Sequence, residues 1–251
     1  FKYVYQNIKK DVHLSSISGG TDIVSCFVLG NIYQPVHMGE IQNKGLALNV
    51  DILNDKGKPI KNSKGELVCK NPFPTMPLKF WNDKNDNKFK DAYFNRFPNT
   101  WHHGDFAEIK TTRGFVIHGR SDTTLNPGGV RLGTAEIYSE VEKFKEIKES
   151  IVVGQSWDND IRIVLFIVMN AKFFLTEDLL KKIKAQIRKN ASPRHVPSKV
   201  IVVKDIPRTK SGKIVELAVK NTIEGNNIKN EEALANPKAL EQFKGLKELS
   251  I

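Results

Sequence analysis

The stretch IPRTKSGKI, residues 206–214, holds a Gly-Lys pair between two apolar runs, and such a lysine could act on phosphate groups. A P-loop would need a glycine five residues before the pair and a hydroxyl directly after the lysine. Pro207 occupies the first position and has no N–H to offer, and Ile214 occupies the second. This stretch is therefore not a P-loop. Two interpretations stay open from these residues alone: a solvated turn before a helix, or a Lys213 that is held out for chemistry.

Three further stretches carry residue types that bind nucleotides or metal ions: SISGGTDI (16–23), WHHGDFAE (101–108) and GRSDTTLNPGGVRLGTAEI (119–137). Each is ambiguous alone, because Gly-Gly-Thr-Asp and His-Gly-Asp are also typical of turns, and an arginine beside a glycine is more often a surface residue. The tandem His102–His103 suggests catalysis or metal binding, but a packed or exposed pair is the commoner case.

Composition limits the class of protein. The chain has 251 residues and is 39% hydrophobic, which is enough for one large domain or two smaller ones. Its net charge is +11, but the lysines are spread over nearly every segment and no nucleic-acid-binding motif is visible. We therefore favour a solvated basic surface over nucleic-acid binding, although a cofactor with several phosphates would benefit from the same field.

The two cysteines, Cys26 and Cys69, argue against a disulfide framework and fit a reducing compartment. No apolar run is long enough to cross a bilayer. The first residues, FKYVYQNIKK, have no signal-peptide layout and no initial Met, which suggests a cut from a longer chain. We expect a cytoplasmic protein with no membrane insertion. The sequence does not predict an oligomeric state.

The elements that must position these residues are strands in the first half of the chain. LALNVDIL (46–53) and GELVCK (65–70) flank a turn and predict one hairpin, and FAEIK (106–110) and FVIHGR (115–120) predict a second. The stretch between them, 71–86, is rich in Pro, Asn and aromatic residues and is predicted to be an ordered loop.

The second half of the chain has sequence patterns of both helices and strands. Apolar residues at helical spacing predict a helix over 134–147 with Thr134 as its N-cap, and TEDLLKKIKAQIRK predicts an amphipathic helix capped by Thr176. SIVVG, IRIVLFIVM and KVIVV read as strands, and a further helix is expected after Lys213. We place a domain boundary at Ser121–Asp122 and leave the basic tail after Gly225 without a structural prediction.

In their order and spacing, the four stretches resemble the later signature motifs of the acyl-adenylate-forming superfamily. Residues 119–137 are similar, over nearly their whole length, to the hinge motif of its acetyl-CoA synthetase branch. SSISGGTDIVSCF, FWND and RFPNTWHHGD narrow the resemblance, which begins near Asp11, to ligases that act on acetoacetate. The superfamily's phosphate loop and adenine segment are missing from the chain.

The resemblance implies an α/β fold followed by an α+β domain. Residues 1–121 would be the end of a large, hairpin-rich N-terminal domain whose upstream part is absent. Residues 122–251 would be a small mobile C-terminal lid domain that carries the catalytic lysine.

The resemblance also implies roles in nucleotide binding. Thr21 matches a residue that contacts the α-phosphate, and Asp22 matches an acidic residue that helps to hold Mg²⁺. Asp22 stands where the wider superfamily has Glu, and its shorter side chain leaves room for a bridging water. Asp105 matches the carboxylate that accepts hydrogen bonds from both ribose hydroxyls, Arg120 matches a second ribose contact, and Arg131 matches an arginine that meets the nucleotide phosphate.

A second group of residues matches the moving and acyl-binding parts of the family. Lys213 matches the catalytic lysine, and Asp122 matches the hinge about which the C-terminal domain rotates between half-reactions. Gly129 resembles a small residue beside the pantetheine tunnel of coenzyme A, and Arg188 lies where the family places a base near the nucleotide of coenzyme A. Gly19 replaces a Trp that closes the acetate pocket, so room for a longer acid is expected in the acyl pocket.

The expected function is that of an AMP-forming acid:CoA ligase that uses ATP, Mg²⁺ and coenzyme A to make acetoacetyl-CoA. Because the phosphate loop is missing, we expect no complete catalysis by this chain alone. One alternative is a ligase for another short acid, such as a hydroxybutyrate, and another is a non-catalytic binding module of the same fold. Retention of Lys213, Asp105, Arg120 and Arg131 argues against the module. The expected partners are small-molecule substrates and not nucleic acid.

Overall fold

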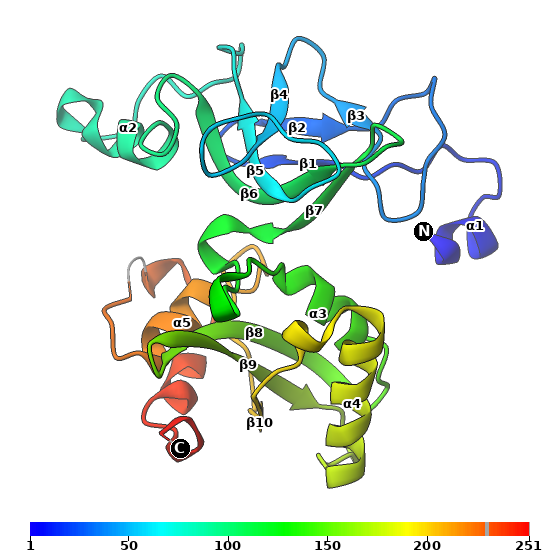
Figure 1. Ribbon diagram of the computed structural model, residues 1–251, viewed down its shortest axis with the longest axis vertical. Coiled ribbons are helices and arrows are strands. Elements are labelled where there is room, and N and C mark those ends of the chain that lie inside the picture. The colour runs from blue at the N-terminus through cyan, green and yellow to red at the C-terminus, as the bar shows by residue number, and fades with distance from the viewer. Residues whose placement is uncertain (229–230, 251) are drawn as a thin grey trace. The chain divides into compact units, whose positions relative to one another are not determined.

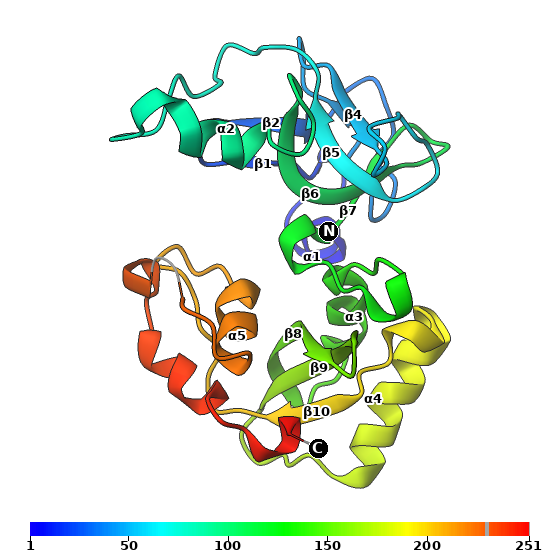
Figure 2. The same ribbon diagram turned by 60° about the vertical axis from the view of Figure 1, so that its left-hand side comes forward.

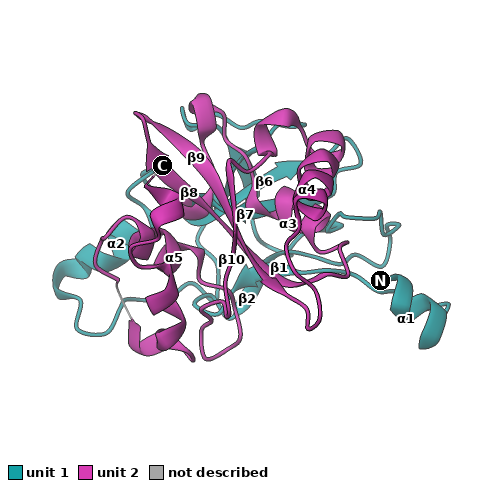
Figure 3. Ribbon diagram, turned by 90° about the horizontal axis from the view of Figure 1, so that it is seen from below, with its two compact units in different colours: residues 1–121 teal, residues 122–251 magenta. Residues whose placement is uncertain are grey.

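The computed structural model describes residues 1–228 and 231–250, which divide into two compact units. Unit 1 is Phe1–Ser121 and unit 2 is Asp122–Ile251 (Figure 3). The division falls at the same peptide bond as the domain boundary expected from the sequence. No helix among the described residues is long and apolar enough to cross a membrane.

Unit 1 contains two antiparallel sheets. Their strand orders are β1-β2-β3 and β4-β5-β6-β7, so strands that are consecutive in sequence pair within each sheet (Figure 1). The described elements are α1 (Lys2–Asn7), β1 (Ser18–Gly20), β2 (Ser25–Leu29), β3 (Asn43–Lys44), β4 (Val50–Leu53), β5 (Gly65–Cys69), the 3₁₀ turn η1 (Lys84–Asp86), α2 (Asn87–Tyr93), β6 (Trp101–Ile109) and β7 (Phe115–Arg120).

The two predicted hairpins of unit 1 are confirmed, with one shortened strand. β4 begins at Val50 and not at Leu46, because Ala47 adopts a left-handed φ of 62° and Leu48 N–H closes a turn onto Gly45. The predicted loop 71–86 contains no strand and only one 3₁₀ turn. The short helices α1 and α2 were not predicted.

Unit 2 is a three-stranded sheet covered on both faces. The strand order is β10-β9-β8, with β8 and β9 antiparallel and β9 and β10 parallel. The described elements are the 3₁₀ turn η2 (Ser121–Thr123), which spans the division, then η3 (Pro127–Gly129), α3 (Thr134–Val141), β8 (Ile147–Trp157), β9 (Asp160–Met169), α4 (Glu177–Asn190), η4 (Pro193–His195), β10 (Lys199–Val202), α5 (Glu216–Ile223), η5 (Glu231–Ala233), η6 (Pro237–Phe243) and η7 (Lys247–Leu249).

The central position of β9 in the sheet explains why its residues 163–169 form an unbroken apolar run. Successive side chains of a strand point to opposite faces. Ile163, Leu165 and Ile167 pack with α3 and α4, whereas Val164 and Phe166 pack with α5 and the tail. Figures 1 and 2 show α5 on one side of this sheet and α3 and α4 on the other. A strand that is buried on both faces has no polar side to alternate with.

Helix ends were predicted with mixed success. Thr176 caps α4 as predicted, and its hydroxyl accepts the Leu179 N–H at 3.2 Å. The prediction for α3 was wrong at both ends: Gly133 is the N-cap, Thr134 is the first helical residue, and the helix ends at Val141. Ile147 belongs to β8. The predicted helix ran on to Ile147 because the apolar spacing of the helix passes into that of the buried strand without a visible break in the sequence.

Candidate functional site

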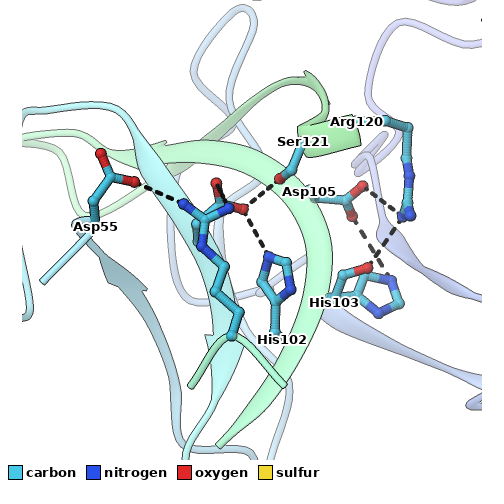
Figure 4. A network of polar contacts seen from close by, with 8 residues as sticks. Asp55, His102, His103, Asp105, Arg120 and Ser121 are labelled. Carbon is cyan, nitrogen blue, oxygen red and sulfur yellow. Dashed lines mark hydrogen bonds and ion pairs between the residues drawn. The ribbon is translucent and has the colours of Figure 1, made fainter. Parts of the chain in front are cut away.

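In unit 1, Asp105 and Arg120 lie opposite each other where β6 and β7 pair. Arg120 Nη1 is 3.4 Å from Asp105 Oδ1 and donates a hydrogen bond of 3.1 Å to the His103 carbonyl oxygen (Figure 4). Asp105 is buried, whereas the Arg120 side chain is half-exposed. A fixed carboxylate thus stands beside a guanidinium that still reaches solvent.

Gly104 permits this arrangement. Its φ of +81° is in the left-handed region, and a Cβ there would lie 2.8 Å from Arg120 Nη2. A side chain at this position would strain the backbone and displace the guanidinium. The left-handed backbone at this position therefore favours the glycine in WHHGD, and the absence of a side chain lets Arg120 lie against it.

The Gly-Gly-Thr-Asp turn joins β1 to β2 and presents Thr21 and Asp22 to solvent. Asp22 Oδ2 accepts a 2.6 Å hydrogen bond from the Tyr93 hydroxyl at the end of α2. The Tyr93 ring stacks on the buried Trp101 ring, with centroids 3.7 Å apart. Burial and the bond to Asp22 both raise the pKa of Tyr93, so the phenol stays a donor at neutral pH. The Asp22 carboxylate is thereby held in one orientation.

The two histidines of WHHGD point to opposite faces of β6, as neighbouring strand residues must. His103 is buried beside the Gly-Gly turn: a Cβ at Gly20 would lie 2.9 Å from His103 Cε1. His102 faces the other way and its Nε2 donates to Glu66 Oε2 at 2.9 Å. Both histidines are packed against other residues, in agreement with the interpretation that such a pair is more often packed or exposed than catalytic or metal-binding.

His103 connects the turn to the β6–β7 pair. Its Nε2 is 3.7 Å from Asp105 Oδ2, and it hydrogen-bonds the Gly19 backbone. Burial lowers the pKa of His103, and the nearby charges of Asp105 and Asp22 oppose this shift only in part. A neutral imidazole therefore sits between the two carboxylates at neutral pH.

Glu66 forms the centre of a second polar cluster in unit 1. Figure 4 labels three members of this cluster, Asp55, His102 and Ser121. Its side chain is completely buried, and its carboxylate pairs with Arg96 at 2.9 Å and with His102. The Ser121 hydroxyl donates to the same carboxylate, and Arg96 also pairs with Asp55 at 2.7 Å. This cluster fixes the residue that follows the end of β7.

In unit 2, the Lys213 loop is a tight antiparallel turn. Thr209 N–H donates to Lys213 O at 2.9 Å, and Lys213 N–H donates to the Thr209 hydroxyl at 3.1 Å. Gly212 has a φ of +83°, and its carbonyl oxygen accepts from Arg208 Nη1 at 3.0 Å. Arg208 Nη2 pairs with Glu149 at 2.9 Å. The backbone of the loop is fixed, and the Lys213 side chain is exposed at its tip.

The tail braces this loop, which the sequence did not predict. Lys210 N–H donates to Ala233 O at 3.1 Å, and Ala235 N–H donates to Arg208 O at 2.8 Å. Leu240 and Phe243 of η6 are buried in the same core as α5. The apolar residues at 234, 240, 243 and 249 were the available signal, but they follow no regular period because the tail is made of 3₁₀ turns.

The hinge-like stretch 119–137 forms an irregular hairpin in unit 2 after Asp122. Leu125 and Leu132 exchange two backbone hydrogen bonds of 3.0 and 2.8 Å. The loop between them presents Arg131, partly buried, and Gly129, whose φ is +75° and whose absent Cβ would meet nothing within 4 Å. Gly128 N–H donates to the Asp160 carboxylate at 2.9 Å, which fixes the turn.

Two of the predicted residues have other structural settings. Arg188 lies exposed in the last turn of α4. A Cβ at Gly19 would lie 2.1 Å from the Ser25 carbonyl oxygen, because β1 and β2 approach closely at an irregular step in their register. The close approach of β1 and β2 therefore requires a glycine at position 19, whatever the size of the acyl pocket. An enlarged acyl pocket stays a prediction.

Comparison with known proteins agrees with this geometry. Residues 136–213 match the family of the AMP-binding enzyme C-terminal domain. Acetoacetyl-coenzyme A synthetase of Rhizobium meliloti (strain 1021) is 61% identical over 249 residues, which cover 99% of this chain and 38% of that protein. The Gallus gallus acetoacetyl-CoA synthetase is 47% identical over 251 residues, with the same two coverages.

The chain is homologous to part of the acetoacetyl-CoA synthetases. The structure of the synthetase from Streptomyces lividans matches with a TM-score of 0.88 and 40% identity, over 94% of this chain and 36% of that one. The resemblance and the fold class inferred from the motifs are confirmed. The chain spans about 38% of the length of these curated synthetases.

The structure brings some predicted residues together within a unit. Asp105, Arg120 and the Thr21–Asp22 turn meet around His103 in unit 1. Unit 2 carries the Lys213 loop, the hairpin with Gly129 and Arg131, and Arg188. Tyr93 was missed because nothing in the sequence connects α2 with a turn seventy residues earlier. His103 was weighed and left without a role. The roles of these residues stay predictions.

Proposed function

We propose that the complete protein is an AMP-forming acetoacetate:CoA ligase. The observation that carries the proposal is the convergence, in unit 1, of Asp105, Arg120 and the Thr21–Asp22 turn around one buried histidine. These residues come from three separate stretches of a chain that is 61% identical to an acetoacetyl-CoA synthetase. A site that had lost its chemistry would have no reason to keep both the residues and their geometry.

The proposed reaction has two halves. In the first, a carboxylate oxygen of acetoacetate attacks the α-phosphorus of ATP, pyrophosphate leaves, and acetoacetyl-adenylate forms. In the second, the sulfur of coenzyme A attacks the acyl carbonyl, the thiol loses its proton, and AMP leaves. Catalysis of the first half depends mainly on alignment and on neutralising charge on phosphate oxygens.

Unit 1 would hold the nucleotide. Asp105, buried and fixed by Arg120 and His103, is suited to accept hydrogen bonds from the two ribose hydroxyls. Arg120 can serve as a second ribose contact because half of its side chain reaches solvent. The Thr21 hydroxyl is exposed on the turn and is available to the α-phosphate.

The residues present fit a magnesium ion that enters with ATP. Mg²⁺ takes one or two carboxylates and fills its other positions with phosphate oxygens and water. Asp22 is a single exposed carboxylate that Tyr93 orients, and no group of three metal-binding side chains occurs among the described residues. When bound, the ion would neutralise charge on the phosphates. Asp22 would hold it directly or through a water molecule.

Unit 2 would supply the positive charge of Lys213, which moves with this unit. Lys213 extends from a loop with a fixed backbone, so its ammonium can be delivered to phosphate and carboxylate oxygens during adenylation. Arg131 would meet the nucleotide phosphate. Gly129 and Arg188 would lie along the path of coenzyme A, with rotation about Asp122 bringing each set into use.

The decisive experiment uses the full-length protein. Acid-dependent release of pyrophosphate and formation of the CoA thioester are followed with acetoacetate, acetate and 3-hydroxybutyrate. Lys213→Ala should slow adenylation by about 10²–10³-fold, because a charge that acts on the developing transition state is lost. Lys210→Ala is the matched control, since Lys210 is an exposed lysine in the same loop.

The outcomes separate the alternatives. A preference for acetoacetate, with adenylation lost in Lys213→Ala and kept in Lys210→Ala, supports the proposal. Faster turnover of another acid would keep the ligase and reject acetoacetate as its substrate. No adenylate with any of the three acids would reject the ligase and favour a binding module.

A further inference from the structure

Asp122 lies between two residues that carry hydroxyl groups, Ser121 and Thr123. Each hydroxyl hydrogen-bonds a glutamate of its own unit, of which Glu66 is fully buried and Glu216 is partly buried. Ser121 donates to Glu66 in unit 1, and Thr123 bonds to Glu216 in unit 2. The two contacts are independent of each other, because each lies wholly within one unit.

The Glu66 attachment is rigid because Glu66 is itself held from several sides. It lies on β5 in the middle of a sheet and has no exposed surface. Arg96 and His102 contact the two carboxylate oxygens, one each, at 2.9 Å. Ser121 is thus tied to the sheet through a group that cannot move without breaking two charge-assisted contacts.

The hydrogen bond between Thr123 and Glu216 links the residue after Asp122 to the helix that follows the lysine loop. Glu216 is the first residue of α5 and follows Lys213 by three positions. It accepts a 2.7 Å hydrogen bond from Tyr138 and a further bond from Thr134, both on α3. The Tyr138 hydroxyl accepts in turn from Val152 N–H of β8 at 3.0 Å. Thr123 is therefore tied to the elements that carry the lysine loop.

A pocket of about 210 Å³ lies beside this second attachment. Asp122, Thr123, Asn126 and Glu216 are among its lining residues. Asp122 itself is exposed. Asp122 thus lines open space, and side-chain contacts hold Ser121 and Thr123 on either side of it.

We propose that Glu66 and Glu216 are positioning residues that clamp Ser121 and Thr123 to their own units and so concentrate the backbone rotation at Asp122. The rotation itself rests on the proposed function, whereas the two clamps are contacts of the structure. If rotation were spread over several residues, the lysine loop would reach the nucleotide in many orientations. Rotation at one residue gives two defined positions, which the two half-reactions require.

The test removes the hydroxyls and not the glutamates, so that both buried clusters keep their folds. Ser121→Ala and Thr123→Val are made singly and together in the full-length protein. Matched controls are Thr112→Val and Ser156→Ala, which remove hydroxyls that bond Glu40 and Glu224, one pair in each unit and neither beside Asp122. Ser121→Thr and Thr123→Ser keep the hydroxyl and serve as rescues.

Two measurements are made on each variant. Pulsed electron paramagnetic resonance gives the distance distribution between nitroxides at Lys56→Cys in unit 1 and Lys181→Cys in unit 2, with ATP and acetoacetate and then with coenzyme A. Amide hydrogen exchange is followed at residues 122–124. In the double variant we expect each distance population to be at least about twice as wide and exchange to rise about tenfold. Controls and rescues should stay within about twofold of the wild type.

Each outcome bears on one claim. Unchanged widths and exchange in the double variant, with normal switching in the wild type, would overturn the clamps and leave the ligase intact. A distance in the wild type that does not change when the substrates are added would also overturn the inference. Whether the protein is a ligase would still be tested by the formation of the CoA thioester. Exchange that rises throughout both units would reveal a folding defect and reject a positioning role.

Discussion

Glu66 in unit 1 and Glu216 in unit 2 are both withdrawn from water and both accept hydrogen bonds from hydroxyl groups, yet their pKa values move in opposite directions. Burial alone would raise the pKa of Glu66, but the bonds from His102 and Ser121 and the charge of Arg96 outweigh it and lower that pKa to about 2. For Glu216, burial raises the pKa, and its bonds from Tyr138 and two threonines do not reverse the shift.

The difference lies in the charge of the neighbours. The Glu66 cluster contains a guanidinium and an imidazole, whereas the Glu216 cluster contains neutral hydroxyls and the carboxylate of Asp122, which adds to the upward shift. In the Glu66 cluster, the hydrogen bonds and the nearby charges together outweigh the loss of water around the carboxylate, whereas in the Glu216 cluster the hydrogen bonds do not. One attachment beside Asp122 therefore includes an ion pair, and the other consists of hydrogen bonds from hydroxyl groups.

The largest effect should come from removing the cation beside Glu66. Arg96→Met leaves a buried carboxylate with a vacant side, and we expect unit 1 to lose about 3–5 kcal/mol of stability. The free energy of opening, measured by amide exchange in β5 and β6 of the full-length protein, checks this. Lys61→Ala, which removes an exposed cation of the same unit, should change it by less than about 0.5 kcal/mol. Equal losses of stability in Arg96→Met and Lys61→Ala would mean that the ion pair between Arg96 and Glu66 does not stabilise unit 1.

Glu66→Gln should cost slightly less and should depend on pH. A carboxyl whose folded pKa is lowered stabilises the fold above its unfolded pKa and loses this contribution as pH falls toward the folded value. With values of 4.5 and about 2, the contribution is about 3 kcal/mol near pH 7 and disappears between those two values. Amide exchange in β5 measured at several pH values tests this, and a difference that stays constant down to the lower value would contradict it.

Tyr138→Phe should have an intermediate effect in unit 2. It removes the donor to Glu216 and the acceptor of the Val152 N–H, and each lost bond costs about 1 kcal/mol. Exchange of the Val152 amide gives the result directly. Tyr5→Phe, at a partly exposed tyrosine of unit 1, is the control for the substitution itself and should leave the Val152 amide unchanged.

The smallest effect should be that of Glu216→Gln. Near pH 7 the change should be below about 1 kcal/mol, because the amide keeps an oxygen that can accept from Tyr138. The pH dependence should run opposite to that of Glu66. A raised folded pKa gives stability that is present below the ordinary glutamate pKa and lost as pH rises through the folded value, so the wild type should gain on the variant toward low pH. A parallel trend for both glutamates would remove the contrast between the clusters.

Sequence patterns predicted the strands well and the polar clusters poorly. The run IRIVLFIVM predicted a strand and Thr176 predicted a helix start, because both signals are local. The partnership of Tyr93 with Asp22 spans 71 residues and depends on how α2 packs against β6. No periodicity in one sequence encodes such a contact.

The candidate site was predictable to the extent that its motifs are contiguous. WHHGD and GRSD predicted Asp105 and Arg120, and the structure adds that Gly104 has a left-handed backbone and lies against the Arg120 guanidinium. Glu66 and Glu216 were not singled out, because a lone glutamate in GELVCK or VELAVK reads as an ordinary surface residue. Only burial and the neighbouring hydroxyls distinguish them.

The pairing of the tail with the lysine loop has a practical consequence for protein engineering. The family match ends at Lys213, but Leu234 forms a bridge with Thr209, and Ala235 N–H satisfies the Arg208 carbonyl. A domain trimmed to the match for grafting or chimera building would lose both α5 and the backbone partners of the Lys213 loop. Swaps of this domain between ligases should therefore carry the donor's own tail, at least through the buried Phe243.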